Sequence, residues 1–173
     1  AGLPTLESHR RQSVEESVRQ LWASGLVDAI LFGDPLVPAE DLTAVAILPR
    51  CFPEPLPIRI RVADVTLAER SLIALPCHTN RTDAAGSVIR SQESRLSAVE
   101  AFLPQAFIQP RRRGDITIDN SGYGRYAGEL QIVLHDLPAD ARVNVVGQVL
   151  EADRCLLDCI FPGRAFRFEE VAE

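Results

Sequence analysis

The chemically richest stretch of the chain covers residues 113–132, where acidic, aromatic and basic side chains gather. Asp119 and Glu129 lie on either side of a break at residues 120–122, the pattern of two strands joined by a tight turn. Two carboxylates that face one substrate can perform glycoside hydrolysis. Alternatively, they accept hydrogen bonds from sugar hydroxyls or pair with Arg125. We favour this second interpretation, because nothing in the sequence identifies an environment that raises a carboxylate pKa.

Alternation along this hairpin sorts its side chains onto two faces. Ile116 and Ile118 are expected on one face, and Asp119 on the other. Asn120 and Tyr123 fall at the turn, where a core requires neither of them. The polar face is therefore a candidate ligand surface, although antiparallel sheets often carry a solvated polar face with no such role.

Three charged residues outside the hairpin add to the candidate chemistry. Arg90 and Arg95 carry planar guanidinium forks that suit phosphate or carboxylate, unless they belong to a solvated loop with salt bridges. Asp34 follows a short apolar run at residues 28–32. In a βα-barrel, catalytic side chains come from the C-terminal ends of strands, so Asp34 is a possible catalytic contributor. The alternative is that Asp34 and Pro35 simply form a turn.

The sequence predicts neither a metal nor a cofactor. Cys155 and Cys159 are four residues apart, but no histidine or further cysteine pair completes a ligand set. No glycine-rich nucleotide-binding motif is present either. All four cysteines are expected to be reduced thiols, typical of a cytoplasmic protein; they are Cys51, Cys77, Cys155 and Cys159.

Short segments of alternating polarity after residue 57 favour a mainly antiparallel sheet or a closed barrel. Strands are expected at 58–62, 71–75, 86–91, 115–120, 126–134, 143–150 and 164–168, with short helices at 97–102 and 153–160.

The N-terminal part of the chain has a different character. We expect a helix over residues 3–24, a buried strand at 28–32 and a second helix from Pro38. Four prolines then mark a linker within residues 49–57. One helix–strand–helix piece cannot close a barrel, so it either packs on the domain that follows or has its partners outside this chain.

Composition argues against two classes of partner. The formal net charge is −6, and the only basic run is Arg111-Arg112-Arg113. Nucleic-acid binding needs a broader basic surface, so we expect no nucleic-acid partner. No apolar stretch is long enough to span a bilayer, so no membrane association is expected.

Several separate motifs resemble one family. They include RGDITIDN at residues 113–120, GYGRYAGELQ at 122–131, the arginine segment at 88–95, RVNVVG at 142–147 and the start at 2–10. Together with the Gly33-Asp34-Pro35 corner, they resemble bacterial 6-phospho-N-acetylmuramidases, long known as outer surface proteins or as a domain of unknown function.

The resemblance implies a TIM-like barrel followed by a cyclophilin-like β-barrel. Residues 1–48 resemble the last part of the first, 49–56 a linker, and 57–173 the complete second domain. The family is cytoplasmic and cleaves a disaccharide containing 6-phospho-N-acetylmuramic acid during cell-wall sugar recycling.

By this resemblance, the chain is the substrate-binding portion of such a hydrolase, without most of the catalytic barrel. The alternative is a non-catalytic ligand-binding or interaction module with a cyclophilin-like barrel. The expected substrate-binding residues are Arg90, Arg95, Asp119, Asn120, Tyr123, Arg125 and Glu129.

Overall fold

The computed structural model describes residues 5–50, 52–83, 85–98 and 101–171. The chain divides into two compact units, the first ending at Pro53 and the second beginning at Glu54. Each unit has its own architecture and is considered by itself.

The first unit is helical. It contains a short 3-10 helix η1 (Glu7–Arg11), α1 (Val14–Ser24) and α2 (Ala39–Ala46). A capping box begins α1, because the Ser13 side chain accepts from the Glu16 amide and the Glu16 side chain accepts from the Ser13 amide. The expected single helix over residues 3–24 is therefore interrupted just before Ser13.

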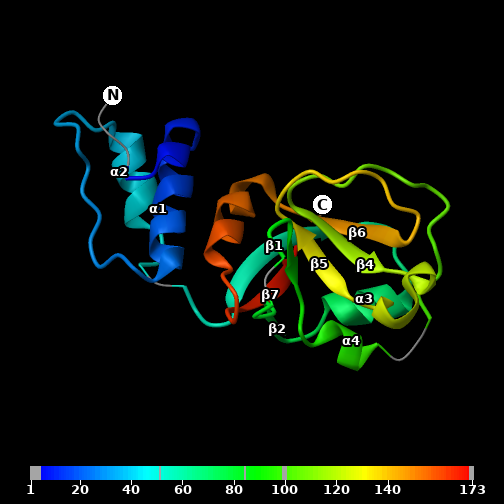
Figure 1. The fold of residues 1–173 in the computed structure, drawn as a ribbon. Coiled ribbons are helices and arrows are strands. Elements are labelled where there is room, and N and C mark those ends of the chain that lie inside the picture. The colour runs from blue at the N-terminus through cyan, green and yellow to red at the C-terminus, as the bar shows by residue number, and fades with distance from the viewer. Residues whose placement is uncertain (1–4, 51, 84, 99–100, 172–173) are drawn as a thin grey trace. The chain divides into compact units, whose positions relative to one another are not determined.

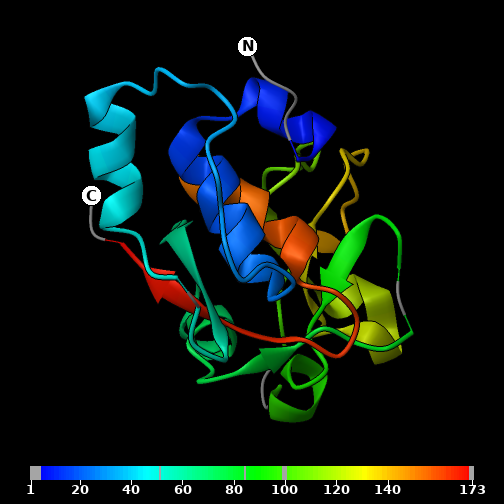
Figure 2. The ribbon, with the colours of Figure 1, turned by 90° about the vertical axis from the view of Figure 1, so that its left-hand side faces the viewer.

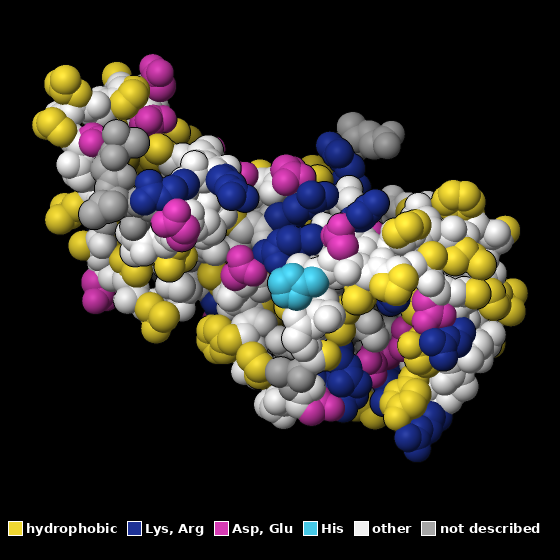
Figure 3. Space-filling view, turned by 45° about the horizontal axis from the view of Figure 1, so that its top comes forward, with side chains coloured by type: hydrophobic (Ala, Val, Ile, Leu, Met, Phe, Trp, Pro, Cys, Tyr) yellow, Lys and Arg dark blue, Asp and Glu magenta, His cyan; other side chains and the backbone are white. Residues whose placement is uncertain are grey.

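Between the two helices, residues 25–38 form an irregular connection. Figures 1 and 2 show that α1 and α2 run in the same direction, so this connection runs back from the C-terminal end of α1 to the N-terminal end of α2. The predicted buried strand at 28–32 is wrong: its residues are irregular, and Leu31 is 91% exposed. A strand needs a hydrogen-bonding neighbour, and no strand is present among the described residues of this unit. Figure 3 shows apolar side chains at the surface of the unit.

The second unit is built around one sheet of seven strands in the order β2-β7-β1-β6-β4-β5-β3. These strands are β1 (Leu56–Val62), β2 (His78–Thr79), β3 (Val88–Arg90), β4 (Asp115–Asp119), β5 (Leu130–Val133), β6 (Val143–Val149) and β7 (Ala165–Glu170). Asn80 bridges Ser91, which joins the two edges of the sheet. The sheet therefore forms a nearly closed barrel (Figure 1). Most pairs are antiparallel, as predicted, but β1 and β7 are parallel.

Alternating apolar side chains fill the inside of this barrel. Ile60, Ile116, Ile118, Leu130 and Ile132 are all fully buried. Burying a side chain of this size contributes about 1.5–3 kcal/mol relative to leaving it in water. Alternation therefore predicts these inward-facing positions of β1, β4 and β5 correctly.

The remaining elements differ more from expectation. Residues 67–73 form α3 (Leu67–Ile73) where a strand at 71–75 was predicted, because Thr66 and Glu69 make a capping box. The short helix expected at 97–102 is wrong, because α4 (Ser94–Ser97) ends where that helix was expected to begin and residues 98, 101 and 102 are irregular. Residues 99–100 lie outside the described residues. The helix expected at 153–160 is a 3-10 helix, η3 (Glu151–Cys159).

The cysteines of the described residues form no disulfide, which agrees with the predicted reduced state. Cys155 and Cys159 are buried in η3, and Cys77 is half-buried. Burial raises the pKa of the Cys159 thiol to about 11, which keeps it protonated at neutral pH. Cys51 lies outside the described residues.

Candidate functional site

The register of three strands creates a polar patch on one face of the sheet. Arg90 of β3 pairs with Gln131 of β5, and Gln131 pairs with Thr117 of β4. One pair further along, the Asp119 amide donates to the carbonyl of Glu129. Since directly paired residues share a face, Asp119 and Glu129 lie beside the row that contains Arg90.

The connection between β4 and β5 is not the predicted tight turn. Residues 121–126 form a 3-10 helix, η2 (Ser121–Tyr126), and β5 begins only at Leu130. Gly128, at φ +86°, allows this connection to pass close to the chain after α4: an added Cβ would lie 2.7 Å from the Cβ of Ala98. The predicted pairing of the two strands is correct, whereas Tyr126 lies in η2 and not in a strand.

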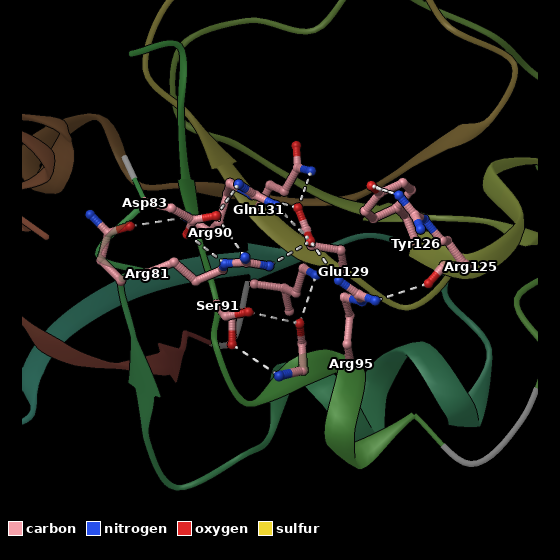
Figure 4. Close-up of polar contacts among 12 residues, drawn as sticks. Arg81, Asp83, Arg90, Ser91, Arg95, Arg125, Tyr126, Glu129 and Gln131 are labelled. Carbon is pink, nitrogen blue, oxygen red and sulfur yellow. Dashed lines mark hydrogen bonds and ion pairs between the residues drawn. The ribbon is translucent and has the colours of Figure 1, made fainter. Parts of the chain in front are cut away.

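Glu129 is the centre of a charged cluster, although it is only 3% exposed. Nε and Nη2 of Arg90 donate to its two carboxylate oxygens at 2.7 and 3.1 Å. Arg81 donates at 3.4 Å, and Arg95 approaches to 3.8 Å. Figure 4 shows these side chains converging on Glu129 from different elements. A buried carboxylate requires such partners, because burying an unpaired charge is costly.

Asp83 neutralises the outer side of the cluster. Nε and Nη2 of Arg81 donate to the Asp83 carboxylate at 2.8 and 2.7 Å, a bidentate pair. These hydrogen bonds from Arg81 lower the pKa of Asp83, so it is ionised at neutral pH. Asp83 is 58% exposed in its side chain and reaches solvent.

Helix α4 holds Arg95 against the same cluster. The buried Ser94 hydroxyl accepts from the Leu130 amide at 3.0 Å and lies 3.2 Å from the Ser91 carbonyl. These bonds tie α4 to the first residue of β5, directly after Glu129. Arg95 Nη2 then donates to the Arg125 carbonyl at 3.0 Å.

Tyr126 contacts two arginines of the site, Arg95 and Arg125. The guanidinium carbons of Arg95 and Arg125 lie 5.1 and 4.9 Å from the centre of its ring, within the range of cation–π attraction. Arg125 Nη2 also lies 2.7 Å from the Tyr126 hydroxyl. Arg125 therefore contacts Tyr126 and not Glu129, contrary to the pairing considered from the sequence.

An open pocket of about 540 Å³ lies over this cluster. Its walls contain Arg81, Thr82, Asp83, Gln92, Arg95, Leu96, Arg125 and Ala127. Together with Arg90 and Glu129 behind it, the region holds four guanidinium groups against two carboxylates, a net charge of plus two. Such a site suits an anionic ligand that also offers hydrogen-bonding groups.

Asp119 lies behind the pocket, and its pKa is shifted from the ordinary value of a carboxyl group. Burial raises the pKa of Asp119 to about 7, and the neighbouring Glu129 carboxylate adds to the rise. Here the structure supplies the pKa-raising environment that the sequence did not identify. Asp119 is only 3% exposed and is not part of the pocket wall, so a substrate does not reach it directly.

Comparison with protein families is decisive for this chain. Residues 56–169 match the model of the 6-phospho-N-acetylmuramidase C-terminal domain, and residues 1–47 match that of the N-terminal domain. The chain belongs to the 6-phospho-N-acetylmuramidase family.

Two solved structures are similar over nearly the whole chain. An uncharacterized protein of B. cereus has a TM-score of 0.72 and 32% identity, over 96% of this chain and 47% of its own. A conserved protein of unknown function from Enterococcus faecalis has a TM-score of 0.67 and 32% identity, over 98% and 45%. The chain spans about half the length of these relatives. No curated protein matches it.

Three further candidates named from the sequence contribute neither to the pocket wall nor to the charged cluster around Glu129. Asn120 is fully buried, caps η2 and donates to the Ala141 carbonyl at 2.9 Å, which is a structural role. Tyr123 stacks beneath the guanidinium of Arg142 at 4.3 Å. Asp34 belongs to the first unit, where it lines a groove together with Phe32 and other residues of that unit.

Sequence reasoning missed Arg81, Asp83 and Tyr126. Arg81 follows β2, whose end pairs with the end of β3, and this long-range closure brings it to Glu129. The available signal was the short spacing of Arg81 and Asp83 after a turn-like segment.

In the described part of the chain, no group of three His, Cys, Asp or Glu side chains is arranged to hold a metal ion. Nor does any described helix have the length and apolar character needed to cross a membrane.

Proposed function

We propose that this chain is the C-terminal, substrate-binding portion of a glycoside hydrolase that acts on a disaccharide containing 6-phospho-N-acetylmuramic acid. The observation that carries the proposal is the arginine-rich pocket beside Glu129, in a chain that matches both parts of the 6-phospho-N-acetylmuramidase family. The substrate offers a phosphate and a lactyl carboxylate, and both are anions that guanidinium groups bind well.

The chemistry of the pocket fits a charged sugar. Arg95 and Arg125 supply positive charge at its wall, while the exposed Asp83 carboxylate can accept hydrogen bonds from sugar hydroxyls. A pocket of about 540 Å³ has the volume of a small-molecule site. We infer that the site binds one sugar unit with its anionic groups.

The second unit is not the source of the hydrolytic chemistry in this proposal. Glu129 is held by Arg90 through two hydrogen bonds, and Asp119 is nearly inaccessible. A carboxylate that donates a proton or attacks an anomeric carbon must reach the sugar. Asp34, in the first unit, remains the candidate within this chain for a catalytic contribution.

The order of the helices in the first unit supports a barrel origin. Two helices run in the same direction, and residues 25–38 run back from the end of α1 to the start of α2 (Figure 2), as the strand between successive helices of a βα repeat does. We propose that residues 1–48 are the last part of a TIM-like barrel and that the second unit is a cyclophilin-like domain. We also propose a cytoplasmic location, because cysteines outside disulfides are typical of a reducing compartment.

Isothermal titration calorimetry with 6-phospho-N-acetylmuramic acid tests the proposal. We expect the chain to bind this sugar, and to bind N-acetylglucosamine at least about tenfold more weakly, since tenfold corresponds to about 1.4 kcal/mol of lost charge interactions. Affinity should fall as salt is added, because salt screens the guanidinium charges. Equal affinity for the two sugars would overturn the proposed substrate.

A further inference from the structure

The four arginines of the cluster fall into two pairs with different surroundings. Arg81 is engaged by the Asp83 carboxylate at 2.7 and 2.8 Å, and Arg90 by the Glu129 carboxylate at 2.7 and 3.1 Å. Each of these bidentate pairs uses the fork of its guanidinium and cancels its charge. An incoming anion would have to displace a carboxylate to bind either one.

Arg95 and Arg125 are different. Among the described residues Arg125 forms no ion pair, and the ion pair of Arg95 is a 3.8 Å approach to Glu129, which Arg90 already holds. Both line the pocket wall. The net positive charge of the site is therefore concentrated on these two guanidinium groups.

Tyr126 brings these two charges together. Both guanidinium groups lie within 5.1 Å of its ring centre, and Arg125 lies 2.7 Å from its hydroxyl. Both positive charges therefore depend on the same ring for part of their stabilisation, and an anion bound at this wall of the pocket would add to it.

We propose that Arg95 and Arg125 form the subsite for the phosphate of a sugar phosphomonoester, with Tyr126 as the positioning residue for both. This assignment rests on the proposed function, which makes the pocket a site for an anionic sugar. A phosphomonoester carries close to two negative charges and three acceptor oxygens, so it can engage two guanidinium groups at once. A carboxylate carries one charge and two oxygens, and one guanidinium group can bind both oxygens at once.

Calorimetry on five variants of the whole chain tests this subsite. The probes are 6-phospho-N-acetylmuramic acid, N-acetylglucosamine 6-phosphate and unphosphorylated N-acetylmuramic acid. Arg95→Ala and Arg125→Ala should each weaken binding of both phosphorylated probes by about tenfold or more, with little change for N-acetylmuramic acid. Arg142→Ala is the matched control, because Arg142 also stacks on a tyrosine but lies outside the pocket wall. It should leave every affinity unchanged.

The fourth and fifth variants change Tyr126. Tyr126→Leu removes ring and hydroxyl, so it should lower affinity for the phosphorylated probes as the arginine variants do. The conservative Tyr126→Phe keeps the ring and should restore most of that affinity, which loss of fold stability alone would not produce. Circular dichroism on each variant checks that the fold is retained.

The outcomes separate the two proposals. Wild-type affinity for phosphorylated probes in both arginine variants overturns the subsite. The wild type could bind the two phosphorylated sugars equally well and Arg95→Ala could lose the affinity for both. This result would support the phosphate subsite and overturn the muramic acid substrate. No binding of any phosphorylated probe by the wild type overturns both.

Discussion

Replacing Asp119 with asparagine should change how the stability of the fold depends on pH. Burial raises the pKa of Asp119 from an ordinary value of 3.8 to about 7, and the charge of Glu129 adds to the rise. Between these two values the folded chain keeps a proton that the unfolded chain has released. The wild type should therefore lose stability from this group as the pH rises.

The size of the effect follows from the pKa shift. Because the folded state binds more protons, the free energy of unfolding falls from about pH 4 upward and levels off above about pH 7. The shift is about three pH units, and each unit corresponds to about 1.4 kcal/mol, giving a total of about 4 kcal/mol. Asparagine has no proton to lose, so Asp119→Asn should gain about 4 kcal/mol relative to the wild type between pH 4 and pH 8.

Urea unfolding at pH 4 and pH 8, followed by circular dichroism, measures this gain. Comparison with the wild type at each pH cancels the contributions of titrating groups that do not interact with Asp119. Asp136→Asn is the control, because hydrogen bonds from Arg112 lower the pKa of Asp136. Its titration in the folded and the unfolded state then lies at or below about pH 4, so this variant should differ from the wild type by nearly the same amount at both pH values. A difference between Asp119→Asn and the wild type that is the same at both pH values would refute the account of Asp119.

Four further predictions concern the fold. Burial lowers the pKa of His78, so the wild type should lose stability as the pH falls below about 6.5, and urea unfolding of His78→Gln should show no such loss. Gly128→Ala should destabilise the fold by about 1–3 kcal/mol, because the new Cβ meets neighbouring side chains; a change within 0.5 kcal/mol, the usual range at a surface site, would contradict this. Arg90→Ala should cost about 3–5 kcal/mol, because it leaves Glu129 buried without its main partner, and Arg90→Lys should recover part of the loss in the same denaturation series. Deleting residues 1–53 should leave a domain with a single cooperative urea transition, and an unstructured product would show that the second unit depends on the first.

The sequence predicted the barrel strands well because their pattern is local. Alternation marks Ile116 and Ile118 as inward-facing, and both are fully buried in β4. The apolar run at 28–32 was misleading, because composition alone does not reveal whether a neighbouring strand is present. The predicted strand at 71–75 failed because the capping box of Thr66 and Glu69 fixes a helix that precedes and overlaps it.

The candidate site was predicted in part. Arg90, Arg95 and Glu129 are brought together, although their proximity depends on pairing between β3 and β5 that the sequence does not display. Arg81 was missed because it reaches the site only when the sheet closes through Asn80. Long-range closure is set by the whole barrel, and no short motif encodes it.

A crystal structure of the chain with 6-phospho-N-acetylmuramic acid tests the central claim most directly. We predict that the phosphate oxygens lie about 2.7–2.9 Å from guanidinium nitrogens of both Arg95 and Arg125, with the sugar in the pocket beside Asp83. Well-ordered sugar bound elsewhere, for example against the stacked Arg142 and Tyr123, would contradict the claim that this pocket is the substrate site.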